Sequence, residues 1–197
     1  MIIVLIYGLL FAAGLPEESG ALERVWHVRN ESRLTISGES NVNDFRCQVD
    51  NYYSADNLHL YSSAGSDFRF SQNRIVINLM EFDCGRNLIT RDFRESLNAE
   101  RDPEMIISFL SLNKLPANAS KTESLSGNLK ITIAGITREV DVLLEASNNG
   151  NGTTLLDGRH QFQFSDFNLE APTKMWGLIN VKNELEVSFN LILEEVL

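Results

Sequence analysis

The chain has 197 residues, a length typical of one domain, and its 43% hydrophobic and 22% charged residues give a globular rather than a disordered composition. The formal net charge of −10 argues against nucleic acid as a partner, because a duplex-binding surface needs a basic stripe, and against docking on an anionic membrane face. The acidity is typical of a soluble protein.

The N-terminal segment Met1–Gly14 contains no charged residue and is mostly Ile, Leu, Val, Phe and Ala. It is shorter than the roughly 20 residues that a membrane-spanning helix needs. Its length and its small C-terminal residues, Ala12-Ala13-Gly14, are typical of a signal-peptide core, although no Lys or Arg precedes it. We expect residues 1–14 to be a signal peptide that directs the chain to the periplasm or outside the cell. The alternative is a buried N-terminal helix or strand.

Alternation of apolar and polar residues with period two dominates the rest of the chain. The first strand candidates are short and lie at residues 24–29, 33–40, 58–62, 67–71 and 74–82. The last of these is apolar on both faces, as is a candidate at residues 105–112. We therefore expect a helix or the N-terminal segment to cover their outer side.

One helix is expected between these two segments. Thr90 is its N-cap candidate, and Asp92 lies in the first turn, where a carboxylate is favourable. Phe93 and Leu97 follow at helical spacing, and the helix must end before Pro103.

A β-hairpin is predicted at residues 125–146. Leu129 and Ile131 point to one side before a reversal at Ala134–Thr137, and the apolar positions then change parity to include Val140 and Val142. This change keeps the apolar faces of both strands on one side of the sheet.

The C-terminal strands alternate most clearly. Residues 159–165 place Phe162 and Phe164 on one face, and residues 177–181 lead into the final strand, at residues 183–194, which carries Val187 and Phe189 on its apolar face. About nine strand candidates and one helix predict an all-β domain over residues 22–197, either a sandwich or a small barrel.

The cysteines Cys47 and Cys84 are the two in the chain. In an exported protein we expect them to form a disulfide, and the alternative is two buried thiols. Neither lies in a CxxC motif or beside a histidine at metal-ligand spacing, so no redox or zinc motif is indicated.

Catalytic and metal-binding motifs are not evident in the sequence, which contains no GxSxG, phosphate loop or HExxH. The histidines His27, His59 and His160 fall on different strand candidates, and we interpret them as surface or hydrogen-bonded residues rather than metal ligands. We therefore expect neither an enzyme nor a cofactor.

Four stretches follow one another along residues 32–193: residues 32–47, residues 92–104, the Gly127–Val140 hairpin, and residues 164–172 and 176–181 with the alternating final strand. Together they resemble the YceI-like family of bacterial lipid-binding proteins, and the hairpin is similar to the family pattern G-x-L-T-I-x-G-x-T-R-x-V. The chain departs from the family at Thr90-Arg91, where a Met-Asp pair is expected. The Cys47/Cys84 pair looks like the version found in Bacteroidetes-type members.

This resemblance implies an antiparallel eight-stranded lipocalin-like β-barrel with one short helix. It also implies a partner, a long-chain isoprenoid or other apolar lipid held inside the barrel without catalysis. The residues expected to line the barrel interior are Leu129, Ile131, Phe162, Phe164, Val187 and Phe189.

Two interpretations of the apolar interior remain open. The six side chains either line a lipid cavity or fill the barrel as a plain core, since small barrels often close by packing. A filled barrel would suit a structural, stress-response or interaction protein of the cell envelope. A homodimer is left open in both cases.

Overall fold

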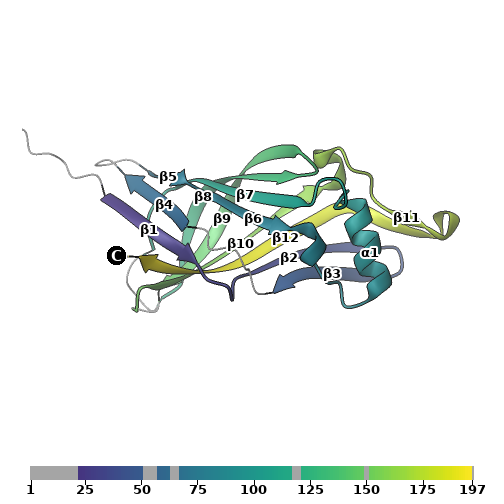
Figure 1. Cartoon of the computed structure of the whole chain (residues 1–197), viewed down its shortest axis with the longest axis horizontal. Helices are drawn as coiled ribbons and strands as arrows, with labels where there is room; N and C mark the ends of the chain where they lie inside the picture. Colours follow the sequence, from purple (N-terminus) through teal and green to yellow (C-terminus); the bar gives the residue numbers. More distant parts are fainter. Residues whose placement is uncertain (1–21, 51–56, 63–66, 117–120, 149–150, 197) are drawn as a thin grey trace, which may run out of the picture.

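The computed structural model describes residues 22–50, 57–62, 67–116, 121–148 and 151–196, most of which lie in β-strands. Figure 1 shows an elongated barrel with strands running obliquely along its length. The signal-peptide prediction for Met1–Gly14 lies outside the described residues.

Eight strands form a closed antiparallel ring, which confirms the predicted barrel. In ring order they are β1 (Leu22–Val28), β4 (Asn57–Ser62), β5 (Phe68–Gln72), β7 (Glu104–Leu112), β8 (Glu123–Ile133), β9 (Ile136–Asn148), β10 (Thr153–Gln163) and β12 (Ile179–Val196). The ring closes where β12 pairs with β1, with Leu193 opposite Val28. Closure removes the exposed edge that an open sheet would present.

Three further strands lengthen the barrel toward one end: β2 (Arg33–Ser40), β3 (Asp44–Asp50) and β6 (Arg74–Asn78). The 18-residue strand β12 pairs with β1 near its C-terminus and with β2 over residues 181–190. In the same way β7 pairs with β5 near its C-terminus and with β6 over residues 104–108.

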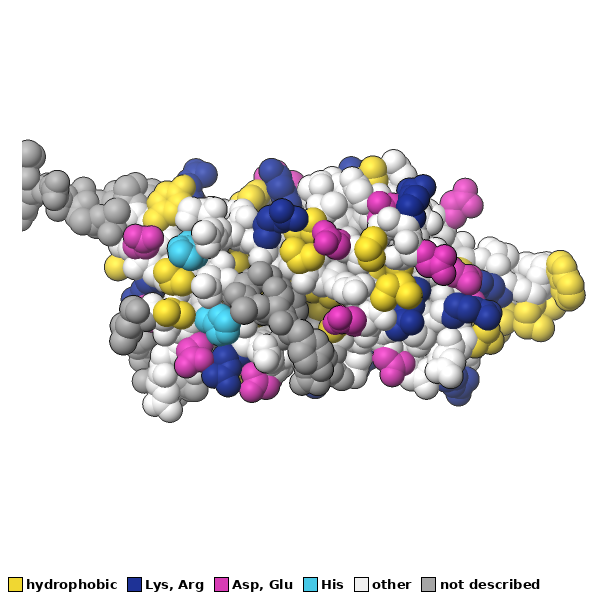
Figure 2. Space-filling model, in the orientation of Figure 1, with side chains coloured by type: hydrophobic (Ala, Val, Ile, Leu, Met, Phe, Trp, Pro, Cys, Tyr) yellow, Lys and Arg dark blue, Asp and Glu magenta, His cyan; other side chains and the backbone are white. Residues whose placement is uncertain are grey.

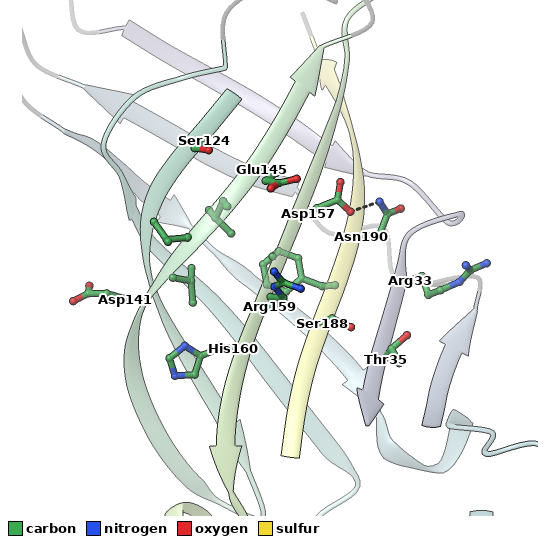
Figure 3. A pocket seen from close by; sticks show the side chains of 15 residues that line it. Arg33, Thr35, Ser124, Asp141, Glu145, Asp157, Arg159, His160, Ser188 and Asn190 are labelled. Atoms are coloured by element: carbon green, nitrogen blue, oxygen red, sulfur yellow. Dashed lines mark hydrogen bonds between the residues drawn. The ribbon is translucent and has the colours of Figure 1, made fainter. Parts of the chain in front are cut away.

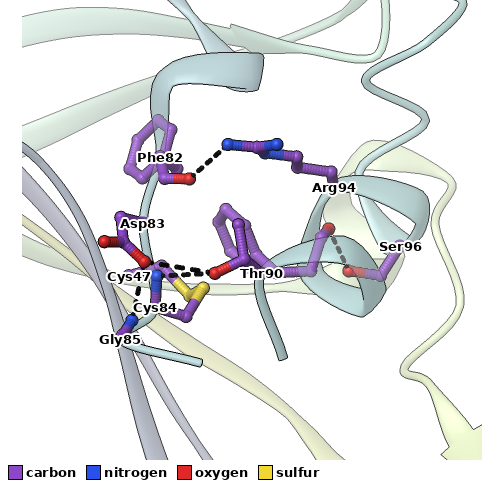
Figure 4. Close-up of a disulfide and its surroundings, with 9 residues drawn as sticks. Cys47, Phe82, Asp83, Cys84, Gly85, Thr90, Arg94 and Ser96 are labelled. Atoms are coloured by element: carbon purple, nitrogen blue, oxygen red, sulfur yellow. Dashed lines mark hydrogen bonds between the residues drawn. A yellow bond between two sulfur atoms is a disulfide. The ribbon is translucent and has the colours of Figure 1, made fainter. Parts of the chain in front are cut away.

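The wall between β3 and the chain that follows β6 is closed by covalent and backbone bonds. Gln48 and Asp83 exchange two backbone hydrogen bonds of 2.9 Å each. Their neighbours Cys47 and Cys84 form a disulfide, as predicted (Figure 4). In the chain-entropy model, closing a loop of this length stabilises the fold by roughly 3–4 kcal/mol.

One end of the barrel carries the helix α1 (Asn87–Ser96), the short strand β11 (Thr173–Lys174) and the 3₁₀ turn η3 (Met175–Gly177) (Figure 1). Two other 3₁₀ turns are η1 (Leu79–Glu81) and η2 (Phe164–Phe167). Within the described ranges, no helix is long and apolar enough to cross a membrane.

The predicted hairpin and final strand are confirmed. β8 and β9 pair with Leu129 opposite Val140, and every predicted inward residue of the final strand is buried, Val187 and Phe189 among them. The reversal is shorter than predicted, because Ile136 and Thr137 already belong to β9. The turn consists of Ala134 and Gly135, both with positive φ, which suits the right-handed twist of the strands.

The predicted helix start was wrong. α1 begins at Asn87, and Thr90 lies inside it, where its hydroxyl accepts a hydrogen bond from the Cys84 backbone N–H at 3.0 Å. The same hydroxyl donates to Asp83 Oδ1 at 3.3 Å. Thr90 therefore tethers the preceding loop rather than capping the helix (Figure 4).

Residues 74–82 are apolar on both faces for a reason other than the expected covering by a helix or the N-terminal segment. The strand β6 ends at Asn78, and the η1 turn then redirects Leu79 and Phe82 into the core. Phe82 packs on Phe93 of α1 with ring centroids 5.4 Å apart. In β7, the outward Ile106 is half-buried and lies opposite Val76 of β6.

Candidate functional site

All six residues predicted to line the barrel interior are buried, none more than 6% exposed: Leu129, Ile131, Phe162, Phe164, Val187 and Phe189. Aromatic rings fill much of the space between them. Phe189 meets Phe109 with ring centroids 6.1 Å apart, and Phe162 meets Phe167 at 5.4 Å. The small void beside Phe189 measures about 20 Å³. The middle of the barrel is thus a packed core, and a ligand-binding role for these six residues stays a prediction.

An apolar cleft of about 390 Å³ lies at the α1 end of the barrel. It is bounded by α1 on one side and by the β2–β3 turn and the chain from β11 to β12 on the others. Its apolar lining consists of Val42, Phe45, Leu88, Ile89, Phe93, Phe164, Pro172, Met175, Ile179 and Val181. Of the six predicted residues, Phe164 is the one that reaches this cleft.

The local sequence explains how α1 presents its apolar side to the cleft. Ile89, Phe93 and Leu97 are spaced four residues apart and therefore share one face of the helix. Phe93 and Leu97 are buried, and Ile89 is half-buried at the cleft. The helix ends at Ser96 with Leu97 as its C-cap, and Asn98 adopts the left-handed conformation that commonly terminates helices.

Several bonds fix α1 against the barrel (Figure 4). Arg94 donates from its guanidinium to the Phe82 carbonyl at 2.9 Å, and Thr90 holds the loop that carries Cys84. The disulfide joins this loop to β3, whose Phe45 forms the opposite wall of the cleft. The cleft is therefore held open between braced elements.

At this wall of the cleft, the Phe45 ring packs across β2 over Gly38, its cross-strand partner. A Cβ atom at Gly38 would lie 2.5 Å from the Phe45 ring, so the ring occupies the space that glycine leaves free. With Phe164, which is 1% exposed, Phe45 separates the cleft from the packed core.

Ion pairs lie along the rim of the cleft. Lys174 Nζ is 3.1 Å from Asp92 Oδ1 and 3.6 Å from Glu95 Oε2. Nearby, Lys182 is hydrogen-bonded to Glu39, and this bond raises the pKa of the lysine. The cleft lining also includes the charged residues Asp44 and Arg91, so apolar walls and charged groups lie side by side in it.

A second, broader depression of about 720 Å³ lies on the outer wall of β8, β9, β10, β12 and β2 (Figure 3). Its polar side chains, such as Arg33, Asp141 and Arg159, come from the solvent-facing positions of the strands and stand apart from one another (Figure 3). Among the labelled side chains, Asp157 and Asn190 form a hydrogen bond of 2.6 Å, in which the Asp157 carboxylate accepts from the Asn190 amide. The depression has the character of a solvated sheet face.

The histidines are not brought together. His27 on β1 and His59 on β4 lie on neighbouring strands, where His27 Nδ1 is 3.1 Å from Asn57 Oδ1, whereas His160 is on β10 and packs on Phe162. Among the residues that the structure describes, no group of three His, Cys, Asp or Glu side chains could hold a metal ion.

The geometry of the cleft supports binding of an apolar group.

Sequence reasoning missed most of the cleft. It identified Phe164, but not Val42, Ile89 or Val181. The spacing of Ile89 four residues before Phe93 was a usable signal, obscured by placing the helix start at Thr90. Val42 and Val181 carried no such signal, because they meet only through the pairing of β2 with β12.

Comparison with protein families gives a match over residues 26–193 to the YceI-like domain. Comparison with curated proteins gives no match. The Bacteroidetes-type origin suggested by the cysteine pair is not tested by these findings.

Solved structures with the same fold come from several bacteria. A polyisoprenoid binding domain from Saccharophagus degradans, implicated in plant cell wall breakdown, superposes with a TM-score of 0.64 at 13% identity over 86% of this chain and 97% of that one. BcnA of Burkholderia cenocepacia superposes with a TM-score of 0.52 at 18% identity, over 82% of this chain and 95% of that one. The Campylobacter jejuni YCEI protein superposes with a TM-score of 0.51 at 11% identity, over 98% of this chain and 94% of that one. At these identities the likeness establishes the fold alone.

Proposed function

Because the chain belongs to the YceI-like family, we propose that it is a non-catalytic binding protein for an apolar lipid, with a polyisoprenoid-like chain as the ligand. The observation that carries this proposal is the apolar cleft of about 390 Å³ beneath α1. The similar fold of a polyisoprenoid binding domain supports the choice of ligand class.

The chemistry of the cleft suits a hydrocarbon chain. Ligand pockets commonly measure about 300–1,000 Å³ and are lined mostly by apolar and aromatic side chains. Each CH₂ group transferred from water contributes about 0.8 kcal/mol, so a tail buried against Phe45, Phe93 and Phe164 needs few polar contacts. The charged groups at the mouth, Lys174 and Asp92, would face a polar head group.

The tail would enter at the cleft and reach inward past Phe164. Beyond that side chain the core is packed around Phe189, with a void of about 20 Å³. A chain longer than the cleft therefore requires Phe45 or Phe164 to rotate, and Leu129, Ile131, Phe162, Val187 and Phe189 would then be the next residues it meets. This is the role that we propose for the predicted interior set.

Export is part of the proposal. The Cys47–Cys84 disulfide favours an oxidising compartment such as the bacterial periplasm. The apolar segment Met1–Gly14 would direct the chain there as a signal peptide.

A second candidate function rests on the packed interior. The Phe109–Phe189 and Phe162–Phe167 contacts fill the middle of the barrel, as expected for a structural or interaction protein of the envelope that carries no ligand. Self-association as a homodimer fits this candidate equally well and remains a proposal.

Native mass spectrometry of the purified chain separates the two candidates. The lipid-binding proposal predicts a co-purifying lipid, or an adduct of one molecule when geranylgeraniol is added, with palmitate as the comparison ligand. No adduct with either ligand, together with no extractable lipid, would leave the filled barrel as the better account.

A further inference from the structure

Five apolar side chains are exposed at the α1 end of the barrel, on three separate segments. They are Val42 at 55%, Leu88 at 62%, Met175 at 60%, Trp176 at 102% and Leu178 at 67% of their full exposure. Figure 2 shows hydrophobic side chains gathered at the end of the molecule where Figure 1 places β11. We refer to these five residues as the apolar tip. Contiguous exposed apolar surface of this kind marks an interaction site more often than single exposed residues do.

The backbone holds Trp176 outward in an unfavourable conformation. Met175 and Trp176 are both non-glycine residues with positive φ, at 53° and 54°, and Gly177 follows at 89°. Two consecutive side-chain-bearing residues in this region are uncommon, and such strain tends to persist where it serves a function. The strained turn projects one of the two tryptophan side chains of the chain fully into solvent.

The tip is rigidly framed. Thr173 and Lys174 pair with Asn180 and Ile179, so residues 175–178 form a tight hairpin loop. Asn41 donates to the Leu178 carbonyl at 2.9 Å and accepts from the Asn180 backbone N–H at 2.9 Å. These bonds tie the β2–β3 turn, which carries Val42, to the loop that carries Trp176 and Leu178.

The apolar tip is continuous with the cleft. Val42, Leu88 and Met175 are exposed at the tip and also line the cleft, so the cleft opens onto this surface. A hydrocarbon chain could pass between the cleft and a surface in contact with the tip without crossing water.

The charges around the tip indicate what kind of surface it fits. Lys174 is paired with Asp92 and Glu95, and Lys182 is paired with Glu39. Paired charges of both signs match a zwitterionic lipid head-group layer, which also carries both signs. The net charge of −10 opposes a strongly anionic surface.

We propose that the apolar tip docks the protein on the interface of a zwitterionic lipid bilayer, with Trp176 as the anchor. Tryptophan is enriched at membrane interfaces because it combines an apolar ring with a polar N–H. A convex tip of separate side chains can insert into a soft interface, whereas a stable protein partner needs about 800 Å² of complementary surface on each side. The inference extends the proposed function, since docking would place the cleft mouth against lipid.

The two tryptophans allow a direct test, because Trp26 is 2% exposed and Trp176 is fully exposed. The full chain is mixed with phosphatidylcholine vesicles that carry brominated acyl chains, and tryptophan emission is recorded. We expect a blue shift and quenching in the native chain, and neither in Trp176→Ser, whose remaining tryptophan is buried. Sedimentation alone would not isolate the tip, because Met1–Gly14 is itself apolar.

A matched pair of variants keeps the probe in place. Leu178→Ser removes apolar surface from the tip at a residue that does not line the cleft. It should raise the lipid concentration needed for half-maximal quenching of Trp176 by a factor on the order of ten. Leu143→Ser removes a 79% exposed leucine from the outer wall of β9 and should quench like the native chain.

Three results would overturn the docking proposal. The first is that the vesicles do not quench Trp176 in the native chain. The second is that Leu178→Ser and Leu143→Ser change the quenching equally. The third is that the native chain self-associates but does not bind vesicles, and that Trp176→Ser abolishes the self-association, which would make a second copy of the chain the occupant of the tip. Failure of the proposed function is separate: Trp176→Ser should still take up geranylgeraniol added from detergent solution.

Discussion

Phe189 packs its ring directly over Gly158, its cross-strand partner on β10. A Cβ atom at residue 158 would lie 2.3 Å from Phe189 Cζ, a distance that real side chains do not tolerate. The absence of a side chain at Gly158 therefore allows the phenylalanine to fill the middle of the barrel. This pair contributes to a packed core in the middle of the barrel, whereas the apolar cleft lies at the α1 end.

Gly158→Ala should destabilise the chain by about 1–3 kcal/mol, because the added methyl group forces Phe189 from its position in a packed core. Urea unfolding followed by circular dichroism measures this change. In the double-mutant cycle with Phe189→Leu, the alanine should cost less, since the closest clash is gone and the contact with Leu144 Cδ2 at 2.7 Å remains. Additive costs in the cycle would show that the two residues do not oppose each other as described.

Thr90→Val should destabilise the chain by about 1 kcal/mol, because it leaves the half-buried Cys84 N–H without its acceptor. Thr90→Ser is the matched control, since it keeps the hydroxyl. Hydrogen exchange at the Cys84 amide should accelerate in the valine variant and remain slow in the serine variant. Equal exchange in both variants would mean that the hydroxyl does not tether this loop.

Loss of the disulfide should lower the free energy of unfolding by roughly 3–4 kcal/mol. The measurement compares urea unfolding of the native chain with that of the Cys47→Ser/Cys84→Ser variant, each with and without reductant. Reductant should shift the native midpoint toward that of the variant and should leave the variant unchanged. A native midpoint insensitive to reductant under conditions that reduce the bond would contradict this expectation.

Glu31 should titrate below its usual range, because its carboxylate accepts hydrogen bonds from Arg29, which lowers the pKa. A lowered pKa stabilises the fold at pH above the ordinary glutamate value and loses this effect as the pH falls through the folded-state pKa. Both side chains are exposed, so the effect should be small and should shrink in high salt. NMR titration should show a higher Glu31 pKa in Arg29→Met, and an unchanged value would rule out this pairing in solution.

The sequence predicted those parts of the fold that depend on neighbours along the chain. The alternation in β12 and the parity change between β8 and β9 identified which residues face inward, because period-two patterning fixes the buried face of a strand. β3 and the first half of β10 were not assigned as strands. Residues 153–158 of β10 include Asp157 and Gly158, which are uncommon inside strands, and their place there follows from pairing with β12.

The candidate site was harder to predict because it is assembled from distant segments. Val42, Phe93, Phe164 and Val181 meet at the cleft only once the barrel has closed and α1 has been fixed by Thr90 and the disulfide. The sequence pattern shows that these residues are apolar but not whether apolar side chains fill a space or leave one. That difference depends on pairs such as Phe189 and Gly158, whose contact requires the register between β10 and β12.

The most direct test of the lipid-binding account is the affinity for geranylgeraniol of a chain whose cleft has been filled. Val181→Trp places a large ring in the cleft, and Leu143→Trp places the same ring on the outer wall of β9. Native mass spectrometry of both variants, after urea unfolding has confirmed that each is folded, gives the amount of adduct at increasing prenol concentration. The account predicts an affinity at least about tenfold lower for Val181→Trp and a native affinity for Leu143→Trp. Equal, native-like binding by both variants would contradict it.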